Sequence, residues 1–436
     1  MTAVSIERGI EALRQQVDAS VASYMSSCIH CGLCAQACLF YTETGDPKYT
    51  PQRKLEPLYR VWKNDFTLLG RLASMVGMGC KVTDEFLHEW EELMYDSCTL
   101  CGRCTMACPV GIDITAMVRK TREGMVASGH VPEGLIGAAT RAVEGGGPMG
   151  DLLPALKAVI RRSEAATGIP VELDKEGAEY MVILSAQETV GFPEIVEAYS
   201  KIFKQAGVTW TISTETFEGT NVGIQIGSRD IARQLVQNVV DAAEKLKVKA
   251  VIAPECGHAY TALRWEGPNL IGRTYEFGVV HITELVDQLI KEGRIKFKGK
   301  NKNRITYHDP CQTNRRGGML EQPRAILAEI SENLVEMEDA GIWNWCCGGG
   351  GGVGANERAE ELRTTVFLRK KRQLDGVKPD ELVTSCANCR NIIEEALDHY
   401  EMDLPVLGLT EMVAEYMETD ETEEPAADKA AEGEDQ

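Results

Sequence analysis

The cysteines of this 436-residue chain fall into groups whose spacing is typical of metal centres. Two groups near the N-terminus read Cys28-x2-Cys31-x2-Cys34-x3-Cys38 and Cys98-x2-Cys101-x2-Cys104-x3-Cys108. Each matches the bacterial ferredoxin run, in which three thiolates converge on one [4Fe–4S] cubane and the fourth usually ligates the other cluster. We therefore predict two cubanes, with Cys38 completing the second and Cys108 the first. Structural zinc is the alternative, but three cysteines only three residues apart crowd one tetrahedral ion.

A third group lies near the C-terminus and reads Cys311-x34-Cys346-Cys347-x38-Cys386-x2-Cys389. Five thiolates are one more than a cubane or a zinc ion needs, and an adjacent pair does not easily chelate one tetrahedral metal. The group therefore predicts a larger or asymmetric cluster. The glycines that follow, beginning with Gly348, Gly349 and Gly350, would let the backbone approach this cofactor closely. A phosphate-binding loop is the alternative for so many glycines, but the GKS or GKT ending and the GxGxxG spacing are missing.

Other cysteine and histidine residues lie outside these groups and could handle sulfur or protons. Cys256 and His258 are close together in the sequence, and His308 stands three residues before Cys311. Histidine titrates near neutrality, and a cationic His258 would lower the pKa of a nucleophilic Cys256 thiol. The alternative is that each is an ordinary strand-end residue with a structural hydrogen bond. Cys80 stands alone and is expected to be a buried thiol.

The elements that must position these groups change in character along the chain. The region up to residue 178 reads as helical, apart from its cysteine motifs and a glycine-rich break at 145–148. From Tyr180 onward, short apolar runs such as Met181–Leu184 and Ala250–Ala253 alternate with amphipathic helical stretches, which predicts a parallel sheet. Because cysteines follow the predicted strands, their thiols should gather at the carboxyl ends, where open α/β sheets place their sites.

The α/β part of the chain contains an internal repeat. Ile252–Cys256 aligns with Leu382–Cys386, Glu218 falls at the position of Cys347, and Ala259 falls at the position of Cys389. Two copies of one unit are therefore predicted, and only the second keeps its five cysteines. We expect the two copies to pack about a pseudo-twofold axis, so that the remnant around Cys256 faces the intact site.

The resulting fold class is α + α/β, a helical ferredoxin domain followed by a pseudo-twofold pair of α/β units. The predicted regions are a helical domain over 1–118, a helical connector over 119–178, a degenerate unit over 179–296, an intact unit over 302–418 and a disordered acidic tail over 419–436. The net charge of −20 argues against nucleic acid as a partner. No apolar run long enough to span a bilayer and no signal peptide are found, so we expect a cytoplasmic protein.

The third cysteine group resembles the cysteine-rich CCG domain of heterodisulfide reductase catalytic subunits. Two ferredoxin motifs followed by two such units resemble the D-type subunit of heterodisulfide reductase and the related DsrK-type and TmcB-type subunits of membrane-bound redox complexes. The resemblance covers residues 20–418. It implies one noncubane [4Fe–4S] cluster that reduces disulfides, and only one because the first copy is degenerate. Its ligands would be Cys311, Cys346, Cys347, Cys386 and Cys389.

The same resemblance implies partners and a location. Electrons would come from quinol through a b-type cytochrome membrane subunit and other subunits of a quinone-linked complex. The oxidant would be a small DsrC-like protein with redox-active cysteines, or a thiol heterodisulfide, in anaerobic sulfur metabolism. The chain would attach peripherally to the cytoplasmic membrane through a partner subunit. The alternative is an electron-transfer subunit of a glycolate, lactate or glycerol-3-phosphate dehydrogenase, which shares these motifs but does no disulfide chemistry.

Overall fold

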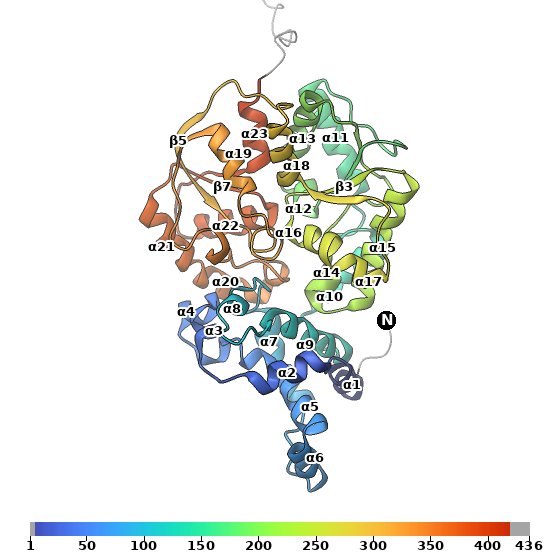
Figure 1. The fold of residues 1–436 in the computed structure, drawn as a ribbon, viewed down its shortest axis with the longest axis vertical. Coiled ribbons are helices and arrows are strands. Elements are labelled where there is room, and N and C mark those ends of the chain that lie inside the picture. The colour runs from blue at the N-terminus through green and yellow to red at the C-terminus, as the bar shows by residue number, and fades with distance from the viewer. Residues whose placement is uncertain (1–4, 419–436) are drawn as a thin grey trace, which may run out of the picture.

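A helical region at one end of the molecule carries two α/β units that lie side by side (Figure 1). The structure is a computed structural model that describes residues 5–418. The acidic tail predicted over 419–436 lies outside the described residues. Within them, every helix is too short or too polar to cross a bilayer.

The helical region holds both ferredoxin motifs between short helices. Its longer helices begin at clear caps, since Thr83 accepts a hydrogen bond from the Phe86 amide and Asp113 from the Ala116 amide. The last helix crosses residue 118, where the first domain was predicted to end, and packs along the first helix of the chain. The helical region therefore extends to Ser128. Its helices are α1 (Ile6–Gln15), α2 (Ala19–Ser27), α3 (Leu33–Gln36), α4 (Leu39–Thr44), α5 (Glu56–Phe66), α6 (Leu68–Met75), α7 (Asp84–Tyr95), α8 (Arg103–Met106) and α9 (Ile114–Ser128).

A helical connector leads to the first α/β unit. It consists of α10 (Glu133–Gly145) and α11 (Leu153–Thr167). The unit contains a parallel sheet of strand order β2-β1-β3-β4, as the apolar runs predict. Its elements are β1 (Tyr180–Val182), α12 (Ala186–Val190), α13 (Glu194–Ala206), β2 (Trp210–Thr211), α14 (Val222–Ile226), α15 (Arg229–Lys245), β3 (Ala250–Ala253), α16 (Gly257–Tyr260), α17 (Gly267–Ile271), β4 (Gly278–His281) and α18 (Ile282–Lys291).

The second α/β unit repeats this topology in a parallel sheet of order β6-β5-β7-β8. Helices α13 and α18 of the first unit pack against α23 and α19 of the second, and one hydrophobic core runs through both. The predicted α + α/β fold with two parallel-sheet units is confirmed. The elements are β5 (Asn301–His308), α19 (Gln322–Ile330), β6 (Ser331–Leu334), α20 (Glu360–Val366), α21 (Leu368–Val377), β7 (Glu381–Thr384), α22 (Ala387–His399), β8 (Val406–Gly408) and α23 (Leu409–Tyr416).

The repeat places equivalent cysteines at equivalent points of the two sheets. Cys256 follows β3 and caps α16 with φ −139°, and Cys386 follows β7 and caps α22 with φ −153°. Leu184 forms an isolated bridge to Glu218, so Glu218 lies beside the end of the first sheet. The alignment drawn from the sequence therefore corresponds to a repeat of the backbone.

A hairpin formed by α5, α6 and the loop to residue 82 projects from the helical end of the molecule (Figure 1). Its base is closed by the Asn64 side chain, which bonds both the amide and the carbonyl of Cys80. Cys80 is exposed on this hairpin, so the expectation of a buried thiol is wrong. The hairpin lacks the packing on several sides that would cover that side chain.

Candidate metal centres

The two ferredoxin motifs have the same local backbone. His30 and Leu100, the second residues after the first cysteine of each motif, have positive φ values of 52° and 56°. Gly32 and Gly102, after the second cysteines, have φ values of 78° and 80° and begin helices α3 and α8. Glycine suits a left-handed position without steric cost. These turns direct the successive thiols of each motif toward one side.

The first motif shares its site with the last cysteine of the second motif. One cavity of about 350 Å³ is lined by four thiols, those of Cys28, Cys31, Cys34 and Cys108. The Ile112 amide donates to the Cys108 sulfur at 3.4 Å, as amides do toward cluster thiolates. The structure thus brings together the residues proposed from the sequence for the first cubane.

The second motif is joined by the last cysteine of the first. The Cys38 thiol interacts with those of Cys98 and Cys101, and the Cys104 thiol interacts with Cys101, Cys38 and Cys98. The buried Lys54 ammonium faces this group and acts to lower the pKa of Cys38 and Cys104, although burial raises both overall. A buried cation beside four thiols fits an anionic cluster, because it offsets the cost of burying negative charge.

The five cysteines of the third group are all buried: Cys311 follows β5, Cys386 and Cys389 follow β7, and the pair Cys346–Cys347 lies in the loop after β6. Their thiols contact one another in pairs. Contacts with Cys346 and Cys389 hold the pKa of the Cys347 thiol well below its usual value. Contact with Cys346 raises the pKa of Cys311. A set of sulfurs that share protons in this way fits a metal–sulfur cluster better than a set of isolated core thiols.

One thiol of the second motif reaches the third group. The Cys101 side chain contacts Cys346, and this contact raises the pKa of Cys101. The surrounding backbone is fixed from the second α/β unit, since Gln312 donates to the Leu100 carbonyl at 3.0 Å and Arg315 donates to the Cys101 carbonyl at 2.9 Å. The helical region and the second unit therefore meet at their cysteine groups.

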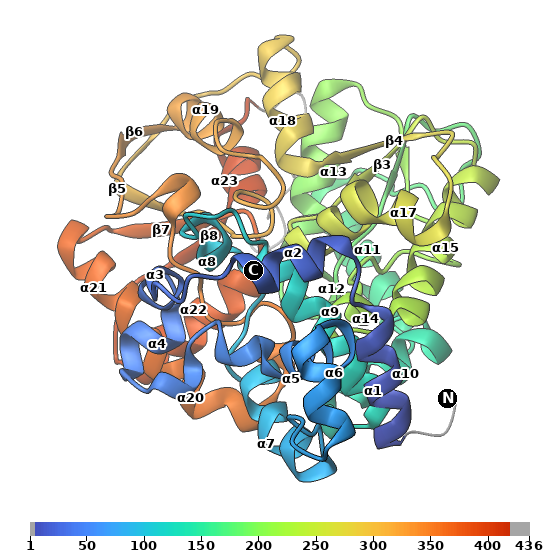
Figure 2. The same cartoon turned by 60° about the horizontal axis from the view of Figure 1, so that its bottom comes forward.

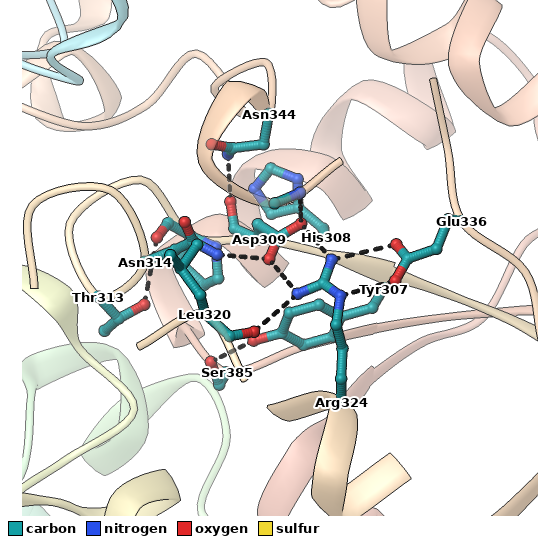
Figure 3. A network of polar contacts seen from close by, with 12 residues as sticks. Tyr307, His308, Asp309, Thr313, Asn314, Leu320, Arg324, Glu336, Asn344 and Ser385 are labelled. Atoms are coloured by element: carbon teal, nitrogen blue, oxygen red, sulfur yellow. Dashed lines mark hydrogen bonds and ion pairs between the residues drawn. The ribbon is translucent and has the colours of Figure 1, made fainter. Parts of the chain in front are cut away.

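A buried carboxylate fixes the turn between β5 and Cys311 (Figure 3). Both oxygens of Asp309 accept from the Arg324 guanidinium, at 2.9 and 3.0 Å, and one also accepts from Asn314 at 2.6 Å. The second oxygen accepts from the Gly341 amide at 2.7 Å. This paired and fully bonded charge holds the start of the turn in a single arrangement.

The glycine run allows the second ferredoxin motif to approach the third cysteine group. The Gly348 amide donates to the Cys346 sulfur at 3.4 Å, as a cofactor-facing loop requires. A Cβ at Gly349 would lie 2.3 Å from Ile392, and one at Gly350 would lie 2.9 Å from the Thr99 carbonyl. The run therefore also makes room for the neighbouring motif, a role that its glycine content alone does not indicate.

Two basic residues face the third group without ordinary partners. Both ring nitrogens of His308 are buried and have no hydrogen-bond partner among the described residues. One of them lies within 4.8 Å of the sulfurs of Cys347 and Cys389. Lys370 is also buried, with the Met337 sulfur at 3.9 Å, and burial lowers its pKa to about 8. A neutral donor ring and a buried cation fit a cluster that offers anionic sulfur to both.

Cys256 of the degenerate unit faces the intact site, where its thiol interacts with that of Cys386. Burial raises the pKa of Cys256, and Cys386 raises it further. The surroundings of His258 do not favour the cationic form that activation of Cys256 would need. Burial lowers the pKa of His258 to about 4, and its Nε2 accepts a hydrogen bond from the Gly351 amide. His258 is therefore neutral and anchors the glycine run.

A cavity of about 370 Å³ reaches one cysteine of the third group from the surface. It lies between α20 and α22, and Cys347 forms part of its wall. Arg363, which pairs with Glu395 at 2.8 Å, lies on one side, and Asp398 and His399 lie on the other. The cavity therefore brings a hollow of ligand size up to the wall of the third group.

Two family models match the chain where its cysteine groups lie. A 4Fe-4S dicluster domain matches residues 24–112, and a cysteine-rich CCG domain matches residues 305–394. The chain is 27% identical to an Hdr-like menaquinol oxidoreductase iron-sulfur subunit of Archaeoglobus profundus, covering 89% of this chain and 79% of that protein. It is 25% identical to the D-type subunit of dihydromethanophenazine:CoB--CoM heterodisulfide reductase of Methanosarcina acetivorans, covering 90% and 93%. It is 27% identical to an EtfAB:quinone oxidoreductase of Syntrophomonas wolfei, covering 86% and 55%.

Proposed function

Because the chain is a heterodisulfide reductase-like iron–sulfur oxidoreductase with a dicluster domain and a CCG domain, we propose that it carries electrons from a quinol-linked membrane complex to a disulfide. Electrons would pass through two cubanes to a noncubane [4Fe–4S] cluster. Two of its relatives, a menaquinol oxidoreductase subunit and a CoB–CoM heterodisulfide reductase subunit, support the quinol end and the disulfide end of this path.

The contact between Cys101 and Cys346 carries the proposal. Cys101 belongs to the second ferredoxin motif and Cys346 to the CCG domain, so the two predicted clusters would share a boundary at these thiols. The first motif lies farther out, with Cys31 exposed. This order of sites, from an exposed entry to a buried end, suits transfer of single electrons in one direction.

The ligands follow from the groups that the structure brings together. We assign Cys28, Cys31, Cys34 and Cys108 to the first cubane and Cys98, Cys101, Cys104 and Cys38 to the second. The five buried thiols of the CCG domain would hold the noncubane cluster. When bound, that cluster supplies the electrons for disulfide cleavage one at a time. These ligands are Cys311, Cys346, Cys347, Cys386 and Cys389.

The residues around this site would balance charge and hold hydrogen bonds to sulfur. Reduction of a disulfide takes two electrons and two protons and gives two thiols. Lys370 would offset the negative charge of the site, and the neutral His308 ring would hold a hydrogen bond toward sulfur. Cys256, which stays a thiol because its pKa is raised by burial, would offer an S–H hydrogen bond to a leaving thiolate, while the proton itself would come from a more acidic group or from solvent. Cys256 is not suited to attack as a thiolate.

The cavity beside Cys347 is the proposed entrance for the disulfide. Its volume lies within the range of ordinary ligand sites. Glu360, Glu395 and Asp398 line it against Arg363 and His399, so a substrate with basic side chains beside its cysteines would be favoured. A DsrC-like protein with redox cysteines on an extended segment and a small thiol heterodisulfide are both accommodated, and sulfur metabolism is the proposed setting.

The partners would be a b-type cytochrome membrane subunit and other subunits of the quinone-linked complex, on the cytoplasmic side of the membrane. A second function is favoured by the likeness to an EtfAB:quinone oxidoreductase. In that case the chain would pass electrons between a flavoprotein and quinone without disulfide chemistry. The loss of the CCG cysteines from the first unit is compatible with both functions.

Anaerobic purification with iron and sulfide quantitation, followed by EPR, tests the proposal. Three clusters of four irons predict about twelve irons per chain, and Cys386→Ser should lower this to about eight with the cubane signals intact. Oxidation by a disulfide substrate should produce a new EPR signal in the wild type and none in Cys386→Ser. Twelve irons with no response to any disulfide, together with copurification of a flavoprotein, would favour the second function.

A further inference from the structure

The projecting hairpin, formed by α5, α6 and the loop to residue 82, concentrates exposed apolar side chains in its outer part. Six of the fifteen exposed large hydrophobic residues among those described lie between Leu68 and Met78. Leu68, Leu69, Met75 and Met78 are each at least 75% exposed. Scattered exposed hydrophobic residues are ordinary in soluble proteins, but a continuous cluster marks an interaction surface.

The hairpin is preformed and presents one apolar face. Leu68, Leu72 and Met75 stand at i, i+4 and i+7 of α6, so they lie along one side of the helix. The opposite side is packed closely on α5, because a Cβ at Gly70 would lie 1.7 Å from the Lys63 carbonyl oxygen. The apolar face therefore belongs to a defined structure and exists before any partner binds.

The charge of the hairpin differs in sign from that of the whole chain. From Phe66 to Thr83 the sequence contains Arg71 and Lys81 and no acidic residue, whereas the chain carries −20. At physiological ionic strength, charges more than about 8 Å apart are largely screened from one another. Since the hairpin projects from the body (Figure 1), its outer part presents its own positive charge to a surface that it meets.

We propose that this hairpin inserts its apolar face into the anionic surface of a lipid bilayer. A short amphipathic helix with leucine and methionine on one side, one arginine (Arg71) and no acidic residue, followed by Lys81 in the loop, has the composition of an interfacial membrane contact. The proposal adds to the proposed function and does not depend on the disulfide chemistry. It changes the sequence-based expectation that the chain reaches the membrane only through a partner.

The contact would orient the first cysteine group. Ile29 and Leu33, which flank Cys31, are exposed, and α3 and α6 both face the viewer in Figure 2, which looks onto this end of the molecule. A hairpin seated in the lipid would turn the end of the molecule that carries the first motif toward the membrane. A quinol-linked donor in the same membrane would then meet the first motif in a fixed orientation.

Flotation of the cluster-loaded chain with vesicles tests the proposal. Vesicles of phosphatidylcholine alone are compared with vesicles containing phosphatidylglycerol, at low and at physiological salt. The wild type should bind the anionic vesicles, with binding reduced by salt. Arg71→Gln should weaken binding about fivefold, as expected for one cation at an anionic surface. Leu69→Asp and Leu72→Asp should each weaken vesicle binding about tenfold. Each variant loses the free energy of inserting about half of one leucine side chain into the lipid.

The controls separate membrane binding from folding and from the disulfide chemistry. Met149→Asp and Val190→Asp change exposed apolar residues elsewhere and should leave binding unchanged. All variants should keep the iron content and disulfide-dependent EPR of the wild type. Equal binding by Leu69→Asp and wild type, or no binding of wild type to anionic vesicles, would overturn the proposal. The second result would indicate a groove of a partner protein as the occupant.

Discussion

Arg122 on α9 joins the helical region to both α/β units, and its replacement should reveal how strongly these parts depend on one another. The side chain is fully buried. One terminal nitrogen donates to the Met94 carbonyl and, at 2.8 Å, to the Cys98 carbonyl, both in the helical region. The other donates to the Gln225 carbonyl of the first unit and, at 2.7 Å, to the Gly351 carbonyl of the second.

The loss in free energy of unfolding caused by Arg122→Met follows from these contacts. Hydrogen bonds from a charged donor are worth about 1.5–3 kcal/mol each, so the loss of four sets an upper range of roughly 6–12 kcal/mol. Methionine also removes the penalty for burying the guanidinium, a penalty visible in the lowered pKa of Arg122. Each of the four buried carbonyls left without this partner costs about 1–3 kcal/mol before the structure relaxes, and with the offset from the guanidinium we take about 4 kcal/mol here.

The shift in melting temperature then reports the size of the cooperative unit. With an unfolding entropy of roughly 2.1 cal/mol/K per residue, 4 kcal/mol lowers Tm by about 15 °C if the region before Gly129 unfolds alone, and by about 5 °C if the whole chain unfolds together. Anaerobic thermal scans at one rate, followed by circular dichroism and by the visible absorbance of the clusters, measure this shift.

Matched variants make the test specific to the buried guanidinium of Arg122. Arg162→Met removes an arginine that is 57% exposed and paired with Glu197, and should change Tm by less than about 1 °C. Arg122→Lys keeps the charge but not the planar fork, so its Tm should lie between those of wild type and Arg122→Met. If the Tm of Arg122→Met equals that of Arg162→Met, the view that Arg122 joins the three parts is refuted.

Three further predictions concern the sites. Cys38→Ser should abolish the same EPR signal as Cys101→Ser, and Cys108→Ser the same signal as Cys31→Ser; the reverse pairing would contradict the crossed ligation. Lys370→Met should lower the CCG-site potential by roughly 40 mV, since about 1 kcal/mol of lost attraction corresponds to that change in a one-electron potential, and an unchanged potential in redox titration would contradict this. The pKa of Glu218 is raised by burial from 4.5 to about 8, so between these values the folded chain binds a proton that the unfolded chain releases, and stability falls as pH rises. Glu218→Gln should therefore flatten the fall of Tm between pH 5 and 8, and an unaltered slope would contradict the shift.

Much of the architecture could be predicted from the sequence because its signals are local or periodic. The ferredoxin runs fix which cysteines turn toward one another within a few residues, and their spacing alone indicates the exchange of Cys38 and Cys108. The repeat was visible because Ile252–Cys256 and Leu382–Cys386 keep the same order of strand and cysteine. Both patterns involve residues that are close together in the sequence, so they can be recognised without knowledge of the tertiary structure.

The interfaces between the parts could not be predicted in the same way. Lys370 lies in the run Leu-Arg-Lys-Lys-Arg, where nothing distinguishes the one buried lysine from neighbours that are partly or fully exposed. Arg122 likewise looks like any other arginine of an amphipathic helix. Their partners are carbonyls and sulfurs from distant segments, which become neighbours only after the units pack. The apolar run around Leu68–Leu72 was present in the sequence, but only its projection shows that the core does not cover it.

The asymmetry of the two units is better understood as a division of labour than as decay. In the first unit, Glu218 occupies the position of Cys347 and accepts from the amides of Ala186 and Thr220 at 3.3 and 2.9 Å. Glu255 bonds across the interface to the amide and hydroxyl of Thr410, and its carbonyl accepts from the Ala387 amide at 2.8 Å. These buried carboxyl groups satisfy the strand ends that a cluster would otherwise organise. The Glu255 carboxylate ties the first unit to α23, and the Glu255 main-chain carbonyl ties it to the start of α22, next to Cys386. The first unit can therefore lack a cluster and still hold Cys256 against the site of the second.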